Sequence, residues 1–146
     1  MSLFNVFNVS GSGMNAQNVR LNTTASNLAN AQSVSSSIEQ TYRARQPVFN
    51  VAESRPFEND FYDYYVGKSA SAGVEVLGIV ESDAPLQTQH NPNHPAANED
   101  GYVFYPNVNV VEEMANMISA SRSFQMNVEV MNSAKSMMQR LLALGQ

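Results

Sequence analysis

The chain has no cysteine and no tryptophan among its 146 residues. Without cysteine it can form no disulfide, no zinc–thiolate site and no thiol nucleophile. No apolar run of about 18 residues occurs, so the sequence predicts no membrane-spanning helix. The first residues also lack the basic region, the apolar region and the small-residue cleavage site of a secretory signal peptide. We therefore expect a chain that neither spans a membrane nor carries a cleaved signal.

Charge is also scarce, and it is unevenly placed. Charged residues make up 14% of the chain, and the net charge is -5. Residues 1–38 contain one charged side chain, Arg20, whereas residues 39–109 contain ten acidic and four basic ones. The acidic balance, without a basic cluster interleaved with aromatics, predicts no nucleic-acid partner. We expect the acidic middle to face water and the nearly uncharged N-terminal segment to pack against neighbours.

Residues 4 to about 31 are predicted to form a helix of roughly 40 Å. Its mainly apolar positions alternate at spacings of three and four, as in the seam of a coiled coil. Asn, Ser, Thr and Gly lower the helix propensity, so we expect this segment to be disordered in the free monomer and helical after assembly. The predicted seam consists of Phe4, Phe7, Gly11, Met14, Asn18, Leu21, Ala25 and Leu28.

A stronger helix of about 35 residues is predicted near the C-terminus. Asn109 is a good N-cap with Glu112 three residues later, and Gly145 is placed to end the helix. The two helices are expected to pair as an intramolecular antiparallel coiled coil, leaving their other faces for other subunits. The second seam is Val110, Met114, Met117, Ser121, Phe124, Val128, Met131, Met138 and Leu142, with Lys135 as its charged interruption. Its many methionines suit either irregular surroundings or plain core filling.

Three stretches between the helices read as β-strands, namely residues 42–51, 73–81 and 101–105. They predict a small antiparallel sheet. The fold class is therefore α+β, with an N-terminal helix segment at 1–38, a β-rich segment at 39–106 and a C-terminal helix segment at 107–146.

The loop at 54–71 is unusually aromatic for an exposed segment. We expect it to pack on a neighbouring subunit or on the sheet through Phe57, Phe61, Tyr62, Tyr64 and Tyr65. Carboxylates of the same region could be imagined as general acids or bases, but no nucleophile or base accompanies them. They are Glu53, Glu58, Asp60 and Asp63.

Two histidines, His90 and His94, are spaced like a helical metal pair. Pro92 and Pro95 prevent that helix, so a polar turn is predicted instead. Two acceptor patterns for glycosylation, at Asn8 and Asn22, fall inside the predicted helix and are attributed to chance. The sequence thus predicts no catalytic residue, no metal site and no cofactor.

Several stretches resemble the flagellar axial proteins. Residues 20–31, RLNTTASNLANA, resemble the signature near the N-terminus of the rod and hook families. Residues 42–45, 91–98, 101–103, 105–114 and 119–137 resemble the proximal rod protein family FlgC, and together these stretches span nearly the whole chain. The segment 54–71 looks longer than the corresponding family loop, so its contacts cannot be carried over.

This resemblance implies a structural subunit of the flagellar drive shaft in the periplasm, exported unfolded through the flagellar type III apparatus. It implies contacts with the proximal rod proteins FlgB and FlgF, the distal rod protein FlgG, the adaptor FliE and copies of the chain itself. Beside the two seams, the expected contact residues include Asn22, Asn27 and Asn30 of the signature. A small periplasmic hydrolase using the carboxylates of 53–63, or a binding module with a disordered tail, are the alternatives.

Overall fold

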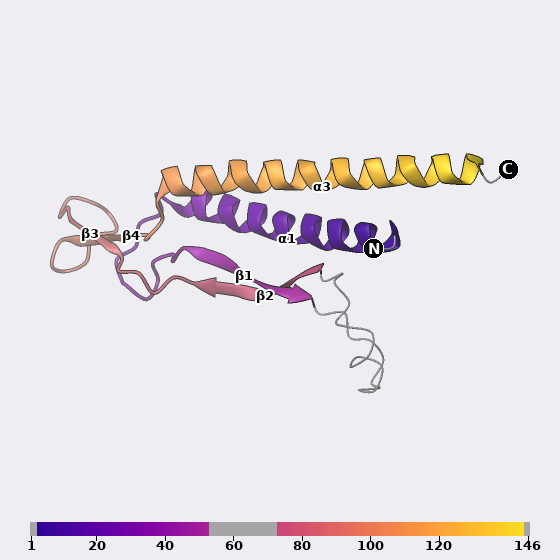
Figure 1. The fold of residues 1–146 in the computed structure, drawn as a ribbon. Coiled ribbons are helices and arrows are strands. Elements are labelled where there is room, and N and C mark those ends of the chain that lie inside the picture. The colour runs from indigo at the N-terminus through magenta and orange to yellow at the C-terminus, as the bar shows by residue number, and fades with distance from the viewer. Residues whose placement is uncertain (1–2, 53–72, 145–146) are drawn as a thin grey trace, which may run out of the picture. The chain divides into compact units, whose positions relative to one another are not determined.

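The computed structural model describes residues 3–52 and 73–144. Helix α1 (Leu3–Asn30) is followed by strands β1 (Arg45–Ala52), β2 (Gly73–Glu81), β3 (Gln87–His90) and β4 (Tyr102–Tyr105), and then by helix α3 (Val110–Leu144) (Figure 1). The predicted α+β class, with a long helix near each end and small antiparallel sheets between, is confirmed.

Two compact units make up the chain. The first contains residues 1–18, 49–77 and 121–146, and the second contains residues 19–48 and 78–120. Each unit thus combines stretches from all three of the segments predicted from the sequence. Both helices and the strands β1 and β2 contribute to each unit, whereas β3 and β4 belong to the second.

Within each unit, α1 and α3 lie beside each other. In the first unit, a Cβ atom added to Gly13 would lie 3.0 Å from the side-chain nitrogen of Asn127. In the second unit, Arg20 donates to the side-chain oxygen of Asn116 at 2.7 Å, and Asn27 donates to the carboxylate of Glu113 at 3.1 Å. Residue numbers in these two hydrogen bonds rise along α1 as they fall along α3, so they confirm the predicted antiparallel pairing.

Small and polar residues beside the predicted seam take part in the helix pairing. Gly13, Arg20 and Asn27 each lie one residue before a predicted seam position of α1, and Glu113, Asn116 and Asn127 do the same on α3. One residue rotates the contact stripe by about 100° around a helix. Small and polar residues occupy the contact stripe, and Gly13 allows a close approach to α3 that a larger residue would block.

The strands form two separate two-stranded sheets in the described part of the chain, β1 with β2 and β3 with β4. Strand β3 pairs antiparallel with β4, from Gln87 opposite Tyr105 to His90 opposite Tyr102. The sequence analysis missed β3, because Gln-Thr-Gln-His has no apolar alternation and Thr88 as its one β-branched residue. Ser35 covers the other edge of β4 through two backbone hydrogen bonds with Phe104.

The connection from β3 to β4 is a polar turn. His94 donates its backbone N–H to the carbonyl oxygen of Asn91, and its ring nitrogen accepts from Ala96. Gly101 then adopts a φ of 78°, the left-handed conformation in which glycine carries no side-chain penalty. His90 ends β3 with its ring edge-on to Tyr102 at 5.1 Å. The two histidines therefore have separate structural roles.

The start of α3 follows the predicted cap. Asn109 accepts the backbone N–H of Val111 with its side-chain oxygen at 3.1 Å. Its carbonyl accepts the N–H of Glu113 at 2.9 Å. Glu112 and Glu113 occupy the first turn, where the helix dipole favours negative charge.

Candidate functional site

A hydrogen-bonded cluster of four residues lies in the second unit, and we call it the Asn27 hub: Asn27, Tyr42, Arg45 and Glu113. Asn27 is 1% exposed. Its amide nitrogen donates to the carbonyl oxygen of Arg45 at 2.8 Å and to Glu113 at 3.1 Å. Its amide oxygen accepts the backbone N–H of Arg45 and the hydroxyl of Tyr42, each at 2.9 Å. The amide thus pairs with both backbone groups of Arg45, as a neighbouring strand would.

Further contacts link the hub residues to α1, to β2 and to the start of α3. Tyr42 also hydrogen-bonds Ser26 at 3.2 Å, and its ring lies 5.5 Å from the guanidinium carbon of Arg45. That guanidinium forms an exposed ion pair with Glu81 at 3.0 Å. The buried carboxylate of Glu113 is stabilised by the Asn27 amide and by the N-terminal end of α3.

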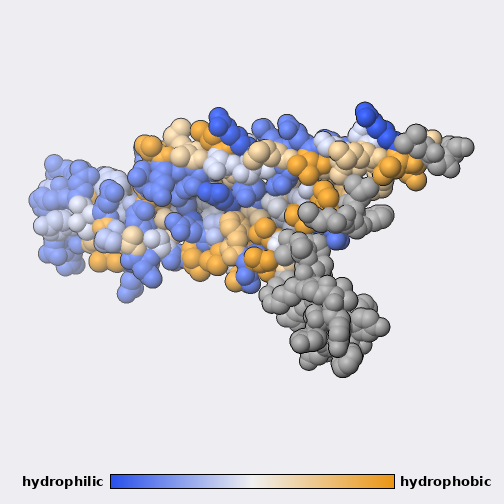
Figure 2. Space-filling view, in the orientation of Figure 1, coloured by the Kyte–Doolittle hydropathy of each residue, from blue (hydrophilic) through white to orange (hydrophobic). Residues whose placement is uncertain are grey.

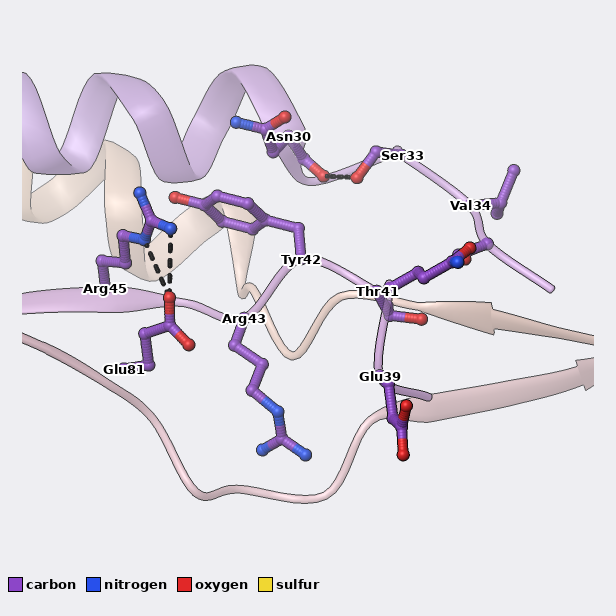
Figure 3. Close-up of a pocket in the computed structure, with 11 residues that line it drawn as sticks. Asn30, Ser33, Val34, Glu39, Thr41, Tyr42, Arg43, Arg45 and Glu81 are labelled. Atoms are coloured by element: carbon purple, nitrogen blue, oxygen red, sulfur yellow. Dashed lines mark hydrogen bonds and ion pairs between the residues drawn. The ribbon is translucent and has the colours of Figure 1, made fainter. Parts of the chain in front are cut away.

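An open polar pocket of about 530 Å³ adjoins the hub (Figure 3). Both arginines that line the pocket have partners within the chain: Arg43 donates to the carbonyl oxygen of Ser82, and Arg45 forms an ion pair with Glu81. The lining is Asn30, Ser33, Val34, Ser35, Glu39, Gln40, Thr41, Tyr42, Arg43, Arg45 and Glu81. Across residues 3–52 and 73–144, no group of three or more His, Asp or Glu side chains is placed to hold a metal ion.

With one exception, the predicted contact residues of the helices that the structure describes are half-buried or exposed in the single chain. Asn27 is the exception, because it is buried against its own β1 and α3. Half-buried positions are Phe7, Met14, Leu21, Leu28, Asn30, Met117, Phe124, Val128, Met131 and Met138. Exposed positions are Asn22, Ala25, Val110, Met114 and Leu142. The side chain of Phe4 and the aromatic residues Phe57, Phe61, Tyr62, Tyr64 and Tyr65 lie outside what the structure describes, as do the carboxylates between 53 and 63.

Sequence reasoning missed a second apolar stripe on α3. Met126, Val130, Met137 and Leu141 are all exposed and lie at spacings of four, seven and four, which places them on one side of the helix. That spacing was available as a signal, but the longer methionine seam obscured it. Figure 2 shows hydrophobic residues at the surface of α3 and of the β1–β2 sheet, where Val51 and Leu77 are exposed. Much apolar surface therefore remains uncovered.

No helix in the described ranges is both long enough and apolar enough to cross a membrane.

Residues 7–34 match the family model described as flagella basal body rod protein. Residues 99–144 match the model described as flagellar basal body rod FlgEFG protein C-terminal. The two matches cover α1 with its signature and the whole region from β4 through α3.

Curated relatives match over the full length. The flagellar basal-body rod protein FlgC of Salmonella typhimurium is 47% identical over 146 residues, which is all of both chains. The same identity and coverage hold for the FlgC of Escherichia coli O157:H7. The FlgC of Borreliella burgdorferi is 36% identical over 151 residues, covering all of this chain and 99% of that protein.

Proposed function

We propose, from the premise that this chain belongs to the FlgC family of flagellar basal-body rod proteins, that it builds the proximal rod by helical assembly. It is a structural rod protein. In the proposed rod, α1 and α3 surround or line the export channel, and contacts between neighbouring subunits transmit torque. This role needs neither catalysis nor a cofactor.

The observation that carries the proposal is apolar surface on α3 that the single chain leaves open. Met137 and Leu141 are 59% and 58% exposed on a helix whose contacts with α1 run through Glu113, Asn116 and Asn127. Burial of such surface contributes roughly 25 cal/mol per Å². The single chain leaves more than half of each of these side chains in water, whereas a helical array would bury them in every subunit.

The proposed partners follow from the family. Copies of the chain and the rod proteins FlgB, FlgF and FlgG would cover the helix faces, and the adaptor FliE would contact the export side. The proposed location is the periplasmic rod, reached through the flagellar type III export apparatus without a cleaved signal peptide. The half-buried apolar residues of α1 and α3 are the proposed subunit contacts.

Leu28→Asp and Phe124→Asp test this assignment. Both residues are half-buried on the predicted seams, so a neighbouring subunit would bury the new charge without a partner. We expect loss of swimming and of rod in purified basal bodies when either variant is the only copy in the cell. Circular dichroism of the purified variants checks that helix content is retained.

The matched controls are Ala29→Asp and Gln125→Asp, each at the next position along the same helix and each at an exposed residue. These variants carry the same added charge and should assemble. Wild-type swimming in Leu28→Asp and Phe124→Asp would contradict the proposed contact faces.

A further inference from the structure

We infer that Asn27 is the positioning residue that sets the register of α1 against both β1 and α3. Its amide has two donor hydrogens and two acceptor lone pairs. All four are used, by the carbonyl and N–H of Arg45, the hydroxyl of Tyr42 and the carboxylate of Glu113. One side chain therefore joins three segments that are distant in sequence.

The register follows from what a shift would leave unpaired. Sliding α1 by one residue turns the amide by about 100° and removes it from every partner at once. Asn27 is 1% exposed and Glu113 is 7% exposed, so water cannot readily replace the lost bonds. An unpaired buried polar group costs about 1–3 kcal/mol, and this shift would leave several. Shifted registers are thereby disfavoured relative to the observed one.

The apolar residues cannot do this alone. A seam with heptad spacing can shift by seven residues and still place apolar side chains opposite one another, and a buried asparagine is a known device for removing that ambiguity. A second polar contact between the helices in this unit, from Arg20 to Asn116, uses a long side chain that tolerates displacement. The short amide at position 27, by contrast, pairs with the backbone of β1 and requires it in a defined position.

The third asparagine of the signature provides the contrast. Asn30 lies three residues later on the same helix and is half-buried. Its amide nitrogen donates to the carbonyl oxygen of Ser26, one turn earlier in α1. This bond is local and would survive any shift of α1. Residue type and place in the motif therefore do not confer the role, whereas the contacts of Asn27 do.

The decisive experiment measures the folding equilibrium of the purified full chain in variants that change the charge and the hydrogen-bond donors at positions 27 and 113. Asn27→Asp keeps both acceptor bonds but removes the donors to Arg45 and Glu113, and it places two carboxylates where a 3.1 Å hydrogen bond stood. We expect the folding equilibrium constant to fall about tenfold or more. Adding Glu113→Gln removes the repulsion and supplies an amide donor to the new carboxylate at position 27, so the double variant should recover the part of that loss that comes from Glu113, whereas the bond to the carbonyl of Arg45 stays lost.

Amide hydrogen exchange separates positioning from general destabilisation. The N–H of Arg45 donates to Asn27, whereas the N–H of Phe104, in the same unit, donates to Ser35. In Asn27→Ala we expect faster exchange at Arg45 with protection kept at Phe104. Should Asn27→Ala unfold the unit, the double variant decides, because recovery requires the Asn27–Glu113 contact.

Asn30→Asp is the matched control, since it adds the same charge one turn away. Glu113→Gln should give no recovery in that background. The inference is overturned if Glu113→Gln fails to rescue Asn27→Asp, if it rescues Asn30→Asp equally, or if Arg45 and Phe104 lose protection in parallel in every variant. It does not depend on the proposed rod role, because each readout concerns the single chain.

Discussion

The two units of the chain bury different kinds of residue. In the second unit the buried side chains include Val103, Pro106 and Asn27, whose amide is hydrogen-bonded within the same unit. In the first unit the described buried residues are small, namely Ser10, Ala16 and Ala134. The large apolar side chains of its α3 segment, such as Met126 and Met137, are exposed instead. Both units expose large apolar residues, among them Met114 and Ile118 in the second unit, so the units differ in what they bury rather than in what they expose.

This difference explains the nearly uncharged helix predicted at the N-terminus. Close packing of α1 against α3 requires small groups, and Gly13 beside Asn127 shows how little space is left. Asn, Ser, Thr and Gly satisfy that requirement but form helices poorly by themselves. The helix in the first unit therefore depends on tertiary and, under the proposed function, quaternary contacts. In the second unit the Asn27 hub supplies such contacts within the chain.

The largest expected effect comes from breaking the second unit at Val103, which is 0% exposed in β4. Val103→Asp would bury a carboxylate without a partner, and we expect a loss of more than about 3 kcal/mol in the free energy of unfolding. Urea denaturation followed by circular dichroism measures it. Thr88→Asp, at an exposed position on the paired strand β3, should change the same quantity by less than about 1 kcal/mol. Equal losses in the free energy of unfolding for Val103→Asp and Thr88→Asp would contradict the placement of Val103 in the core.

The first unit should respond in the opposite way. Met137→Asp replaces an exposed side chain, so we expect a change of less than about 0.5 kcal/mol in the free energy of unfolding of the single chain. Assembly should nevertheless fail, because a neighbouring subunit would have to bury the charge. Swimming and the yield of rod in purified basal bodies measure this. Ser136→Asp, at an adjacent exposed residue on another side of α3, should assemble normally.

Much of the fold was predictable because local signals and tertiary structure agree. The N-cap at Asn109, the turn at Pro92 and Pro95 and the strand at 73–81 all follow from residue type and spacing. The polar contacts between the helices were not predictable by the same reasoning. The apolar periodicity marks a seam, but it does not indicate the polar contacts one residue away from it, such as the hydrogen bond from Arg20 to Asn116.

The Asn27 hub could not be predicted from the sequence for a related reason. The signature places Asn27 in a helix but carries no information that its amide pairs with the backbone of Arg45, 18 residues later. Hydrogen bonds to a backbone leave no residue-type signal at the partner position. Strand β3 was missed likewise, since its four polar residues form a strand only because β4 lies beside them.

The smallest expected effect concerns Arg45 in the second unit, whose backbone and side chain make different kinds of contact. The backbone of Arg45 lies in the hub, whereas its guanidinium pairs with Glu81 at 3.0 Å with both side chains about half exposed, at 48% and 54%. Exposed ion pairs contribute about 0–1 kcal/mol and weaken with salt. Glu81→Gln should therefore lower the free energy of unfolding by less than about 0.5 kcal/mol, and the difference should shrink further in about 1 M salt, as measured by urea denaturation. A loss comparable to that of Asn27→Asp would mean that the ion pair, rather than the buried amide, holds β1 in place.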